Sequence, residues 1–248
     1  MSDLLRKQLQ MLGIQLPPLG SIEIGDSETL YFTTQDRNPV ALWSALREVV
    51  DQTGFWPLLT ADETILENRL DWLPTTVQAL LPAVTSIDAR TWLDLHVADR
   101  VQWDVNFREE IAAGIPSFEP KPRHQYDLPY QYDLWTGLAG PLIVLIPTIH
   151  NWQIPLYLCF GGFNHCPSPE ENACIWRYWN ERYGTESMSM TRDGFEFVVH
   201  NPPQQPSDAY ALACDQFGYC HDMHQRCGSV TNLASQLLGG TSWSFWWD

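Results

Sequence analysis

The chain has 248 residues, of which 30 are acidic and 14 are basic, so it carries a net charge of −16, and 12 of its residues are tryptophan. A hydrophobic content of 44% excludes a disordered chain. The acidic charge, without any cluster of Lys and Arg, argues against binding to nucleic acid or to an anionic membrane.

Cap and turn residues predict the first elements. Residues 1–13 predict a short amphipathic helix rather than a targeting segment. Residues 21–34 have the two β-rich runs of a hairpin. Asn38 and Pro39 are typical of the N-cap and first position of a helix, and Gly54 is typical of its end. Because no apolar stretch is long enough to cross a bilayer, we expect a cytoplasmic protein with reduced cysteines.

A strand and further helices follow. Residues 55–60 predict a strand, and Pro57 indicates an edge position because proline cannot donate to a ladder. Helical patterns occupy about 62–70 and 75–82, and a longer helix is predicted over 88–112.

A connector rich in Pro and Tyr occupies residues 114–140. Its composition predicts irregular structure wrapped on the surface. We expect it to join two halves of the chain, an N-terminal α+β region over 1–113 and a C-terminal α+β domain over 141–248.

Strand and helix patterns alternate in the C-terminal half. Residues 142–148 and 153–161 are predicted to pair as strands across a turn at 150–152. The later patterns indicate a helix, a hairpin, two helices and a last strand, at 168–183, 185–200, 207–219, 229–238 and 242–247. The order predicts an α+β fold in which helices pack on a mostly antiparallel sheet.

The stretch FGGFNHCPSPEEN, residues 160–172, combines polar residues with a helix start. Ser168, Pro169 and Glu171 predict a capping box, in which the Ser oxygen and the Glu carboxylate accept from free backbone N–H groups. Glu170 also lies at the positive end of the helix dipole. We therefore expect both carboxylates to seat the helix rather than to take part in catalysis.

The loop before this helix is a candidate site. Gly161 and Gly162 permit close backbone approach or positive φ, and Asn164 and Cys166 follow them. A Cys nucleophile with a His base is conceivable, but no acidic group that would orient the base is identifiable. A pocket for a ligand is predicted between this loop, the side chain of Trp152 and the segment 219–222. Its binding residues would be Trp152, Gly161, Gly162, Asn164, Cys166, Tyr219 and Asp222.

A zinc site is a further alternative. On a helix, Cys220, His224 and Cys227 would share one face, and Cys166 could add a fourth ligand. The spacing of the two cysteines is not that of a standard zinc knuckle, and Gly228 suggests that the helix ends early. We therefore predict no metal site and no cofactor.

Several motifs carry a resemblance to a known family. The stretches VLIPTIHNW, LCFGGFNHCPSPEE, YWNERYG, GYCHD and SWSFWWD resemble the bacterial domain of unknown function 4253. The resemblance implies a soluble bacterial protein and brings no established activity or catalytic residue. The family pattern is similar at Cys166, Cys220 and Asp222 but not at His221, His224 and Cys227, which argues against a family-wide metal role.

The leading functional hypothesis is a protein-binding module rather than an enzyme, because no complete catalytic set is present. Its acidic charge favours a basic protein partner, and one specific form is an immunity-type protein that masks a basic toxin. An enzyme or small-molecule binder with the pocket described above, and a zinc-stabilised domain, are the alternatives.

Overall fold

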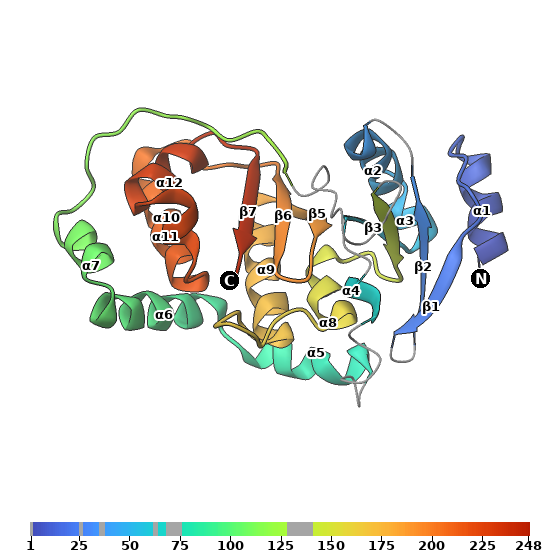
Figure 1. Cartoon of the computed structure of the whole chain (residues 1–248), viewed down its shortest axis with the longest axis horizontal. Coiled ribbons are helices and arrows are strands. Elements are labelled where there is room, and N and C mark those ends of the chain that lie inside the picture. Colours follow the sequence, from blue (N-terminus) through green and yellow to red (C-terminus); the bar gives the residue numbers. More distant parts are fainter. Residues whose placement is uncertain (1, 25–26, 35–37, 62–63, 68–75, 128–140) are drawn as a thin grey trace.

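Seven strands form one sheet in the part of the chain that the structure describes. A computed structural model describes residues 2–24, 27–34, 38–61, 64–67, 76–127 and 141–248. The strand order is β1-β2-β4-β3-β5-β6-β7, and all neighbours are antiparallel except β3 and β5 (Figure 1). The strands are β1 (Gly20–Ile24), β2 (Ser27–Thr33), β3 (Trp56–Thr60), β4 (Leu142–Ile146), β5 (Thr185–Met190), β6 (Gly194–Val199) and β7 (Ser242–Trp246). The predicted α+β fold with a mostly antiparallel sheet is confirmed.

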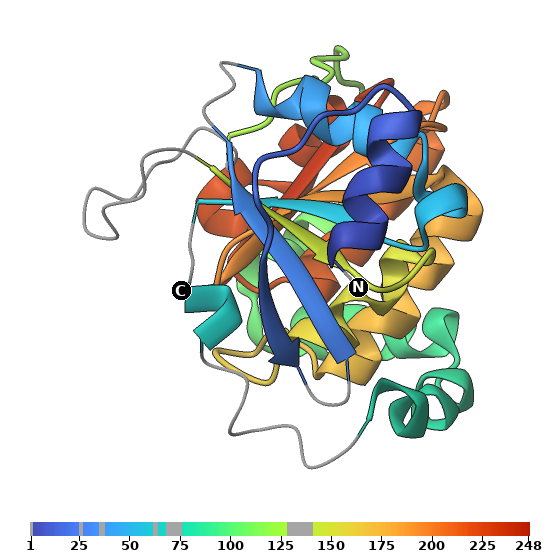
Figure 2. The same cartoon turned by 90° about the vertical axis from the view of Figure 1, so that its right-hand side faces the viewer.

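Helices cover the sheet and its two ends. Helices α10 to α12 stand beside β7 at one end, whereas α1 lies at the β1–β2 end, which faces the viewer in Figure 2. The helices are α1 (Ser2–Met11), α2 (Pro39–Arg47), α3 (Val50–Thr53), α4 (Thr64–Glu67), α5 (Val77–Ser86), α6 (Ala89–Trp103), α7 (Val105–Ala112), α8 (Ile154–Leu158), α9 (Pro169–Tyr183), α10 (Pro206–Tyr219), α11 (Met223–Cys227) and α12 (Val230–Leu237). No helix within the described ranges is both long and apolar enough to traverse a bilayer.

The sheet runs across the predicted boundary between the two halves. Strand β4, from the C-terminal half, lies between β2 and β3 of the N-terminal half. Its Leu145 is opposite Leu30 of β2, and its Ile143 is opposite Leu59 of β3. All five β4 residues are buried, so both halves contribute to one continuous core.

The strand predicted at 153–161 is wrong. A 3-10 turn (Asn151–Gln153) leads into helix α8, with Pro155 in its first turn, where a missing N–H costs nothing. Every α8 residue is buried. A short run of apolar residues alone shows no hydrophobic periodicity, so its sequence does not distinguish a buried strand from a buried helix.

The edge position predicted for the strand with Pro57 is also wrong, because β3 lies between β4 and β5. The junction of β3 with β5 has a short ladder, the pair Leu59 and Ser189. Two indole N–H groups donate hydrogen bonds near this junction. The Trp56 indole donates to the Ser187 carbonyl at 2.9 Å, and the Trp43 indole donates to the Pro57 carbonyl at 2.9 Å. A proline is tolerated because this junction demands few N–H donors from β3.

The long helix predicted over 88–112 is two helices. Asp104 has φ −93° and ψ 102°, which ends α6, and its side chain accepts from the Phe107 N–H at 3.0 Å to start α7. Asp88 caps α6 through the Thr91 N–H at 2.7 Å. The break turns α7 away from the α6 axis (Figure 1).

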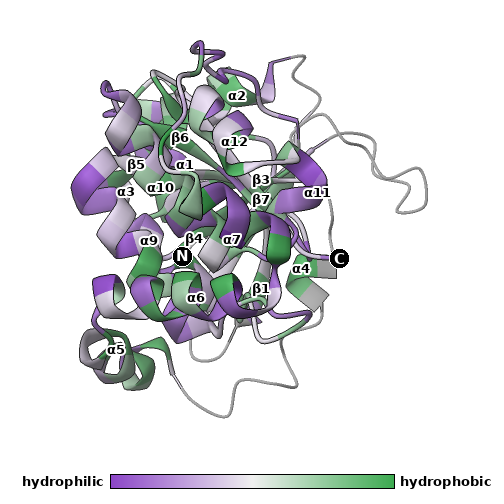
Figure 3. Cartoon of the chain, turned by 90° about the vertical axis from the view of Figure 1, so that its left-hand side faces the viewer, coloured by the Kyte–Doolittle hydropathy of each residue, from purple (hydrophilic) through white to green (hydrophobic). Residues whose placement is uncertain are grey.

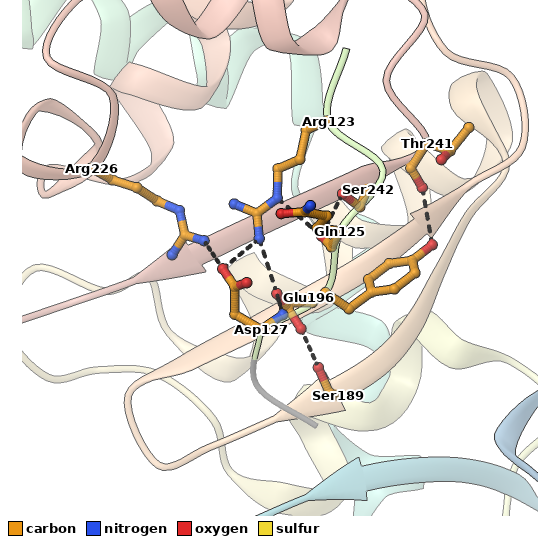
Figure 4. Close-up of polar contacts among 9 residues, drawn as sticks. Arg123, Gln125, Asp127, Ser189, Glu196, Arg226, Thr241 and Ser242 are labelled. Carbon is orange, nitrogen blue, oxygen red and sulfur yellow. Dashed lines mark hydrogen bonds and ion pairs between the residues drawn. The ribbon is translucent and has the colours of Figure 1, made fainter. Parts of the chain in front are cut away.

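The described part of the connector, residues 114–127, contains no helix or strand, as predicted, and residues 128–140 lie outside the described ranges. It is fixed to the sheet at Glu196 of β6, which is fully buried (Figure 4). Glu196 accepts from the Asp127 N–H at 2.9 Å, from Arg123 at 3.3 Å and from the Ser189 hydroxyl at 2.9 Å. Arg226 of α11 approaches the Asp127 carboxylate at 3.5 Å.

The tryptophans serve mainly as core. Trp176 and Trp179 of α9 pack against Phe195, Phe197 and Phe245 of β6 and β7, with ring centroids 4.4–6.4 Å apart. The buried members are Trp43, Trp56, Trp92, Trp176, Trp179, Trp243 and Trp247. Trp152 and Trp246 are partly buried, and Trp103, at the end of α6, is exposed over 51% of its surface.

Candidate functional site

The predicted capping box at the start of α9 is present. The Ser168 N–H donates to Glu171 Oε2 at 2.8 Å, and the Glu171 N–H donates to Ser168 Oγ at 3.3 Å. The Trp92 indole donates to Glu171 Oε1 at 2.9 Å. Burial alone would raise the pKa of Glu171, but the hydrogen bonds from Trp92 and Ser168 outweigh it and hold that pKa below its usual value. Glu171 is therefore ionised and fully occupied in seating the helix.

The loop that precedes α9 has an unusual backbone. Besides Gly161 (φ 123°) and Gly162 (φ 77°), three other residues have positive φ: Cys159 (47°), Asn164 (42°) and His165 (62°). A Cβ at position 161 would lie 1.9 Å from the Pro167 carbonyl oxygen. The close approach predicted for these glycines is thus present at Gly161, whereas Gly162 has no heavy atom within 4 Å of such a Cβ.

A buried hydrogen-bond network lies on the inner side of the loop and is centred on Asn172. Its amide nitrogen donates to the Phe160 carbonyl at 3.1 Å and to the Pro167 carbonyl at 2.8 Å, and lies 3.7 Å from Cys166 Sγ. Its amide oxygen accepts from the Tyr219 hydroxyl. The network therefore joins three parts of the predicted site, which are the backbone next to Gly161, the Cys166 thiol and the Tyr219 hydroxyl.

Sequence reasoning missed Asn172, although a signal was present. Asn172 shares a helix face with Ile175, Trp176 and Trp179 at the i, i+3, i+4, i+7 spacing of buried positions. A single polar residue on an apolar face must satisfy its hydrogen bonds inside the protein. The Trp176 indole completes the network by donating to the Tyr219 hydroxyl oxygen at 3.1 Å.

Three of the predicted residues lie apart from this network. The Trp152 ring contacts His150, with centroids 5.6 Å apart, and the Arg177 guanidinium at 5.7 Å. The Asp222 carboxylate accepts from Gln225 at 3.0 Å and from the Asp248 N–H at 3.1 Å. Asn164 is exposed at the turn of the loop. Whether these residues bind a ligand stays a prediction.

The inner side of the loop offers little room for chemistry. Cys166 is 5% exposed and Tyr219 1% exposed. Burial keeps the pKa of Tyr219 well above its usual value, so the hydroxyl stays protonated. A hollow of about 530 Å³ lies elsewhere, beside Arg6 and Lys7 of α1, and loop residues do not line it.

The geometry gives the zinc alternative no support. Helix α11 begins at Met223, so Cys220 is not on the same helix as Cys227. The Cys220 thiol lies 3.2 Å from the Trp246 carbonyl, and burial raises its pKa to about 12. Within the described residues, no group of three or more His, Cys, Asp or Glu side chains is placed to hold a metal ion.

A buried arginine that the sequence did not reveal joins α6 to this region. Arg100 is 2% exposed, and its Nη1 donates to the carbonyls of Phe217 at 2.6 Å, Cys220 at 3.3 Å and His221 at 3.1 Å. The same guanidinium bonds Asp104 at 3.0 and 3.1 Å. A cation at the C-terminal end of α10 satisfies carbonyls that the helix leaves free and complements the helix dipole.

The outer side of the region is an exposed surface that we term the Trp103 face. Its apolar members are partly exposed, at 63% for Leu95, 51% for Trp103 and 50% for Val105. Figure 3 views the side of the molecule on which α6 and α7 lie. The Trp103 face consists of Leu95, Asp99, Trp103, Val105, His165 and His221.

Three neighbours hold the Trp103 ring. Its indole donates to Asp99 Oδ2 at 3.3 Å, its ring meets the edge of the His221 ring at 5.1 Å, and the Arg100 guanidinium lies 5.4 Å from its centroid. The His221 ring in turn lies 5.0 Å from the His165 ring of the loop. The outer side of the predicted loop therefore adjoins Trp103.

Comparison with known proteins gives one match. Residues 142–248, from β4 to the end of the chain, match the family model described as a domain of unknown function, DUF4253. No curated protein and no solved structure matches the chain. The matched range contains His165 and His221, whereas Trp103 and the rest of α6 and α7 precede it.

Proposed function

We propose, for a chain whose residues 142–248 form a DUF4253 domain, that it is a protein-binding module that docks a basic partner on the Trp103 face. The observation that carries the proposal is Trp103 itself, a large aromatic side chain that is half exposed yet held by three neighbours. Asp99, His221 and Arg100 provide those contacts.

A fixed, exposed tryptophan is the kind of residue that dominates binding energy. Interface hot spots are enriched in Trp, Tyr and Arg, and they lie within a ring of less important contacts. Ordering a side chain on binding costs about 0.5–1.5 kcal/mol, and a ring that is already fixed avoids that cost. Leu95, eight residues before Trp103 on α6, and Val105, two residues after it, are apolar side chains that are each at least half exposed.

The charge of the face supports a basic partner. Asp94 and Asp99 are exposed on α6, and Glu109 is exposed on α7. Among the bases of these helices, Arg90 pairs with Asp215 and Asp94, Arg100 is buried, and Arg108 is exposed on α7. The net charge of −16 adds a long-range field that steers a cationic protein toward the chain.

Hydrogen bonds join the helices beneath the face to the C-terminal helices. Arg90 holds Asp215 of α10 through two hydrogen bonds of 2.7 Å. Glu110 of α7 accepts from the Val230 and Thr231 N–H groups at 3.0 Å and so caps α12. These bonds fix α6 and α7 on the C-terminal helices, which reduces the ordering needed on binding.

A bacterial, cytoplasmic setting is part of the proposal. None of the six cysteines, all of which lie in the described ranges, forms a disulfide, which suits a reducing compartment. In that setting one form of the proposed module is an immunity-type protein that masks a basic toxin.

Site-specific photocrosslinking tests the proposal. A photoreactive aromatic residue replaces Val105, and the matched control carries it at Leu4, an apolar residue 72% exposed on α1. We expect irradiation in the native host to yield one abundant adduct with a basic protein from position 105 and none from position 4. The same adducts from both positions, or none from either, would refute docking on this face.

A further inference from the structure

We infer that the contact between His165 and His221 makes docking on the Trp103 face pH-dependent, so that protonation of His221 weakens the binding of a basic partner. The inference rests on the docking function proposed above and concerns its regulation. It depends on the position of the His221 ring, which lies between the loop and α6.

The two imidazole rings and the Trp103 ring form a chain of contacts. The His165 and His221 ring centroids are 5.0 Å apart with a 33° angle between the planes, and the His221 and Trp103 centroids are 5.1 Å apart. His165 has φ 62°, a left-handed conformation that a side chain with a Cβ adopts at a cost. A constrained backbone therefore directs this ring toward His221.

Charged and titratable groups face His221 from each element packed around it. Helix α6 contributes Arg100 and Asp99, the loop before α9 contributes His165, and the segment of His221 contributes Asp222. Burial lowers the pKa of His221, and the positive charges of Arg100 and His165 lower it further, whereas the two carboxylates oppose them. His221 is therefore neutral at pH 7 and takes up a proton only in acid.

A proton on His221 changes the face in two ways. It places a cation beside Arg100, whose guanidinium bonds the His221 carbonyl at 3.1 Å, and beside His165, and like charges there repel one another. It also adds a positive charge next to Trp103, where a basic partner would dock. If a cation of the partner lies about 7 Å from protonated His221 across a partly aqueous interface, Coulomb's law gives about 5-fold weaker binding.

The coupling is first measured in the free protein. NMR follows the Trp103 indole N–H, assigned by its loss in Trp103→Phe, from pH 8 to pH 5. We expect its shift to titrate with His221 and to lose that titration in His221→Gln. The variant His165→Gln, at an exposed position, is expected to shift the midpoint upward because a nearby cation is removed. His224→Gln, an exposed histidine of the same segment, is the control and should leave the titration unchanged.

An indole signal that does not change between pH 8 and pH 5, or that titrates equally in His221→Gln, overturns the inference. Binding is then measured with the partner captured through position 105. Its affinity should fall about 5-fold more from pH 7.5 to pH 5.5 for the wild-type chain than for His221→Gln. Equal losses for the two chains overturn the inference but leave the docking function intact. Failure to capture any partner refutes the docking function, and the free-protein titration still decides whether His221 is coupled to Trp103.

Discussion

The Arg100→Met substitution tests the buried contact that joins α6 to the end of α10. Methionine has a similar length, so the packing around the side chain is largely kept, but all donors are lost. The carbonyls of Phe217, Cys220 and His221 lose their shared donor, and Asp104, whose side chain is 13% exposed, loses its counter-charge. Removing one partner of a buried ion pair costs about 3–5 kcal/mol.

We therefore expect Arg100→Met to lower the free energy of unfolding by about 4 kcal/mol. In a chain of 248 residues this corresponds to a fall in Tm of about 10 °C. Urea unfolding followed by tryptophan fluorescence and by circular dichroism measures the change, and coincident curves check that unfolding is two-state. Arg108→Met is the matched control, because Arg108 is exposed and reaches the Val101 and Gln102 carbonyls only at 3.4 and 3.3 Å. Equal losses for the two variants would show that Arg100 does not hold α6 in place.

Three further predictions concern the loop, the histidine and the thiols. Gly161→Ala should lower the free energy of unfolding by about 3 kcal/mol or more, because its Cβ would overlap the Pro167 oxygen. Gly162→Ala should lower it by only about 1 kcal/mol, because no heavy atom is close to the added Cβ. Equal unfolding free energies for the two variants would contradict the loop geometry. Because the pKa of His221 is lowered in the folded state, the unfolded chain binds more protons below about pH 6.5. The stability of the wild-type chain relative to His221→Gln should therefore fall as the pH drops from 7.5 to 5, and a constant difference would refute the assignment. The buried thiols Cys166, Cys174, Cys220 and Cys227 should react with a thiol reagent only after unfolding, so rapid labelling of any of them in native buffer, mapped by mass spectrometry, would contradict their burial.

Local signals in the sequence were sufficient to predict many of the helices and strands. The Ser168, Pro169 and Glu171 pattern predicts the start of α9 because all its hydrogen bonds lie within four residues. Asn38 and Asp88 caps are predictable for the same reason. The helix at Ile154–Leu158 was not predictable, since an apolar run without a period fits a buried strand equally well.

The candidate site was less predictable from the sequence because its residues depend on partners that are distant along the chain. Arg100 bonds carbonyls 117 to 121 residues away, and nothing near it in the sequence distinguishes it from an exposed arginine. Trp103 likewise gains its fixed position from His221, a residue of the C-terminal half. By contrast, the buried role of Asn172 could have been inferred from its place on an apolar helix face.

The Trp103 face combines two parts of the chain. Leu95, Trp103 and Val105 precede the range that matches the DUF4253 model, whereas His165 and His221 lie within it. Under the proposed function, the domain would supply the platform and the pH response, and the preceding helices would supply the anchor. A chain with the domain but without α6 and α7 would therefore lack the docking surface.

The affinity of the captured partner for Trp103→Ala tests the central claim most directly. Isothermal titration calorimetry compares the wild-type chain, Trp103→Ala and the control Leu4→Ala, whose side chain is 72% exposed on α1. Truncating a hot-spot tryptophan should weaken binding at least about 10-fold, while the control should bind as the wild type does. Equal affinities for Trp103→Ala and the wild-type chain would contradict the account.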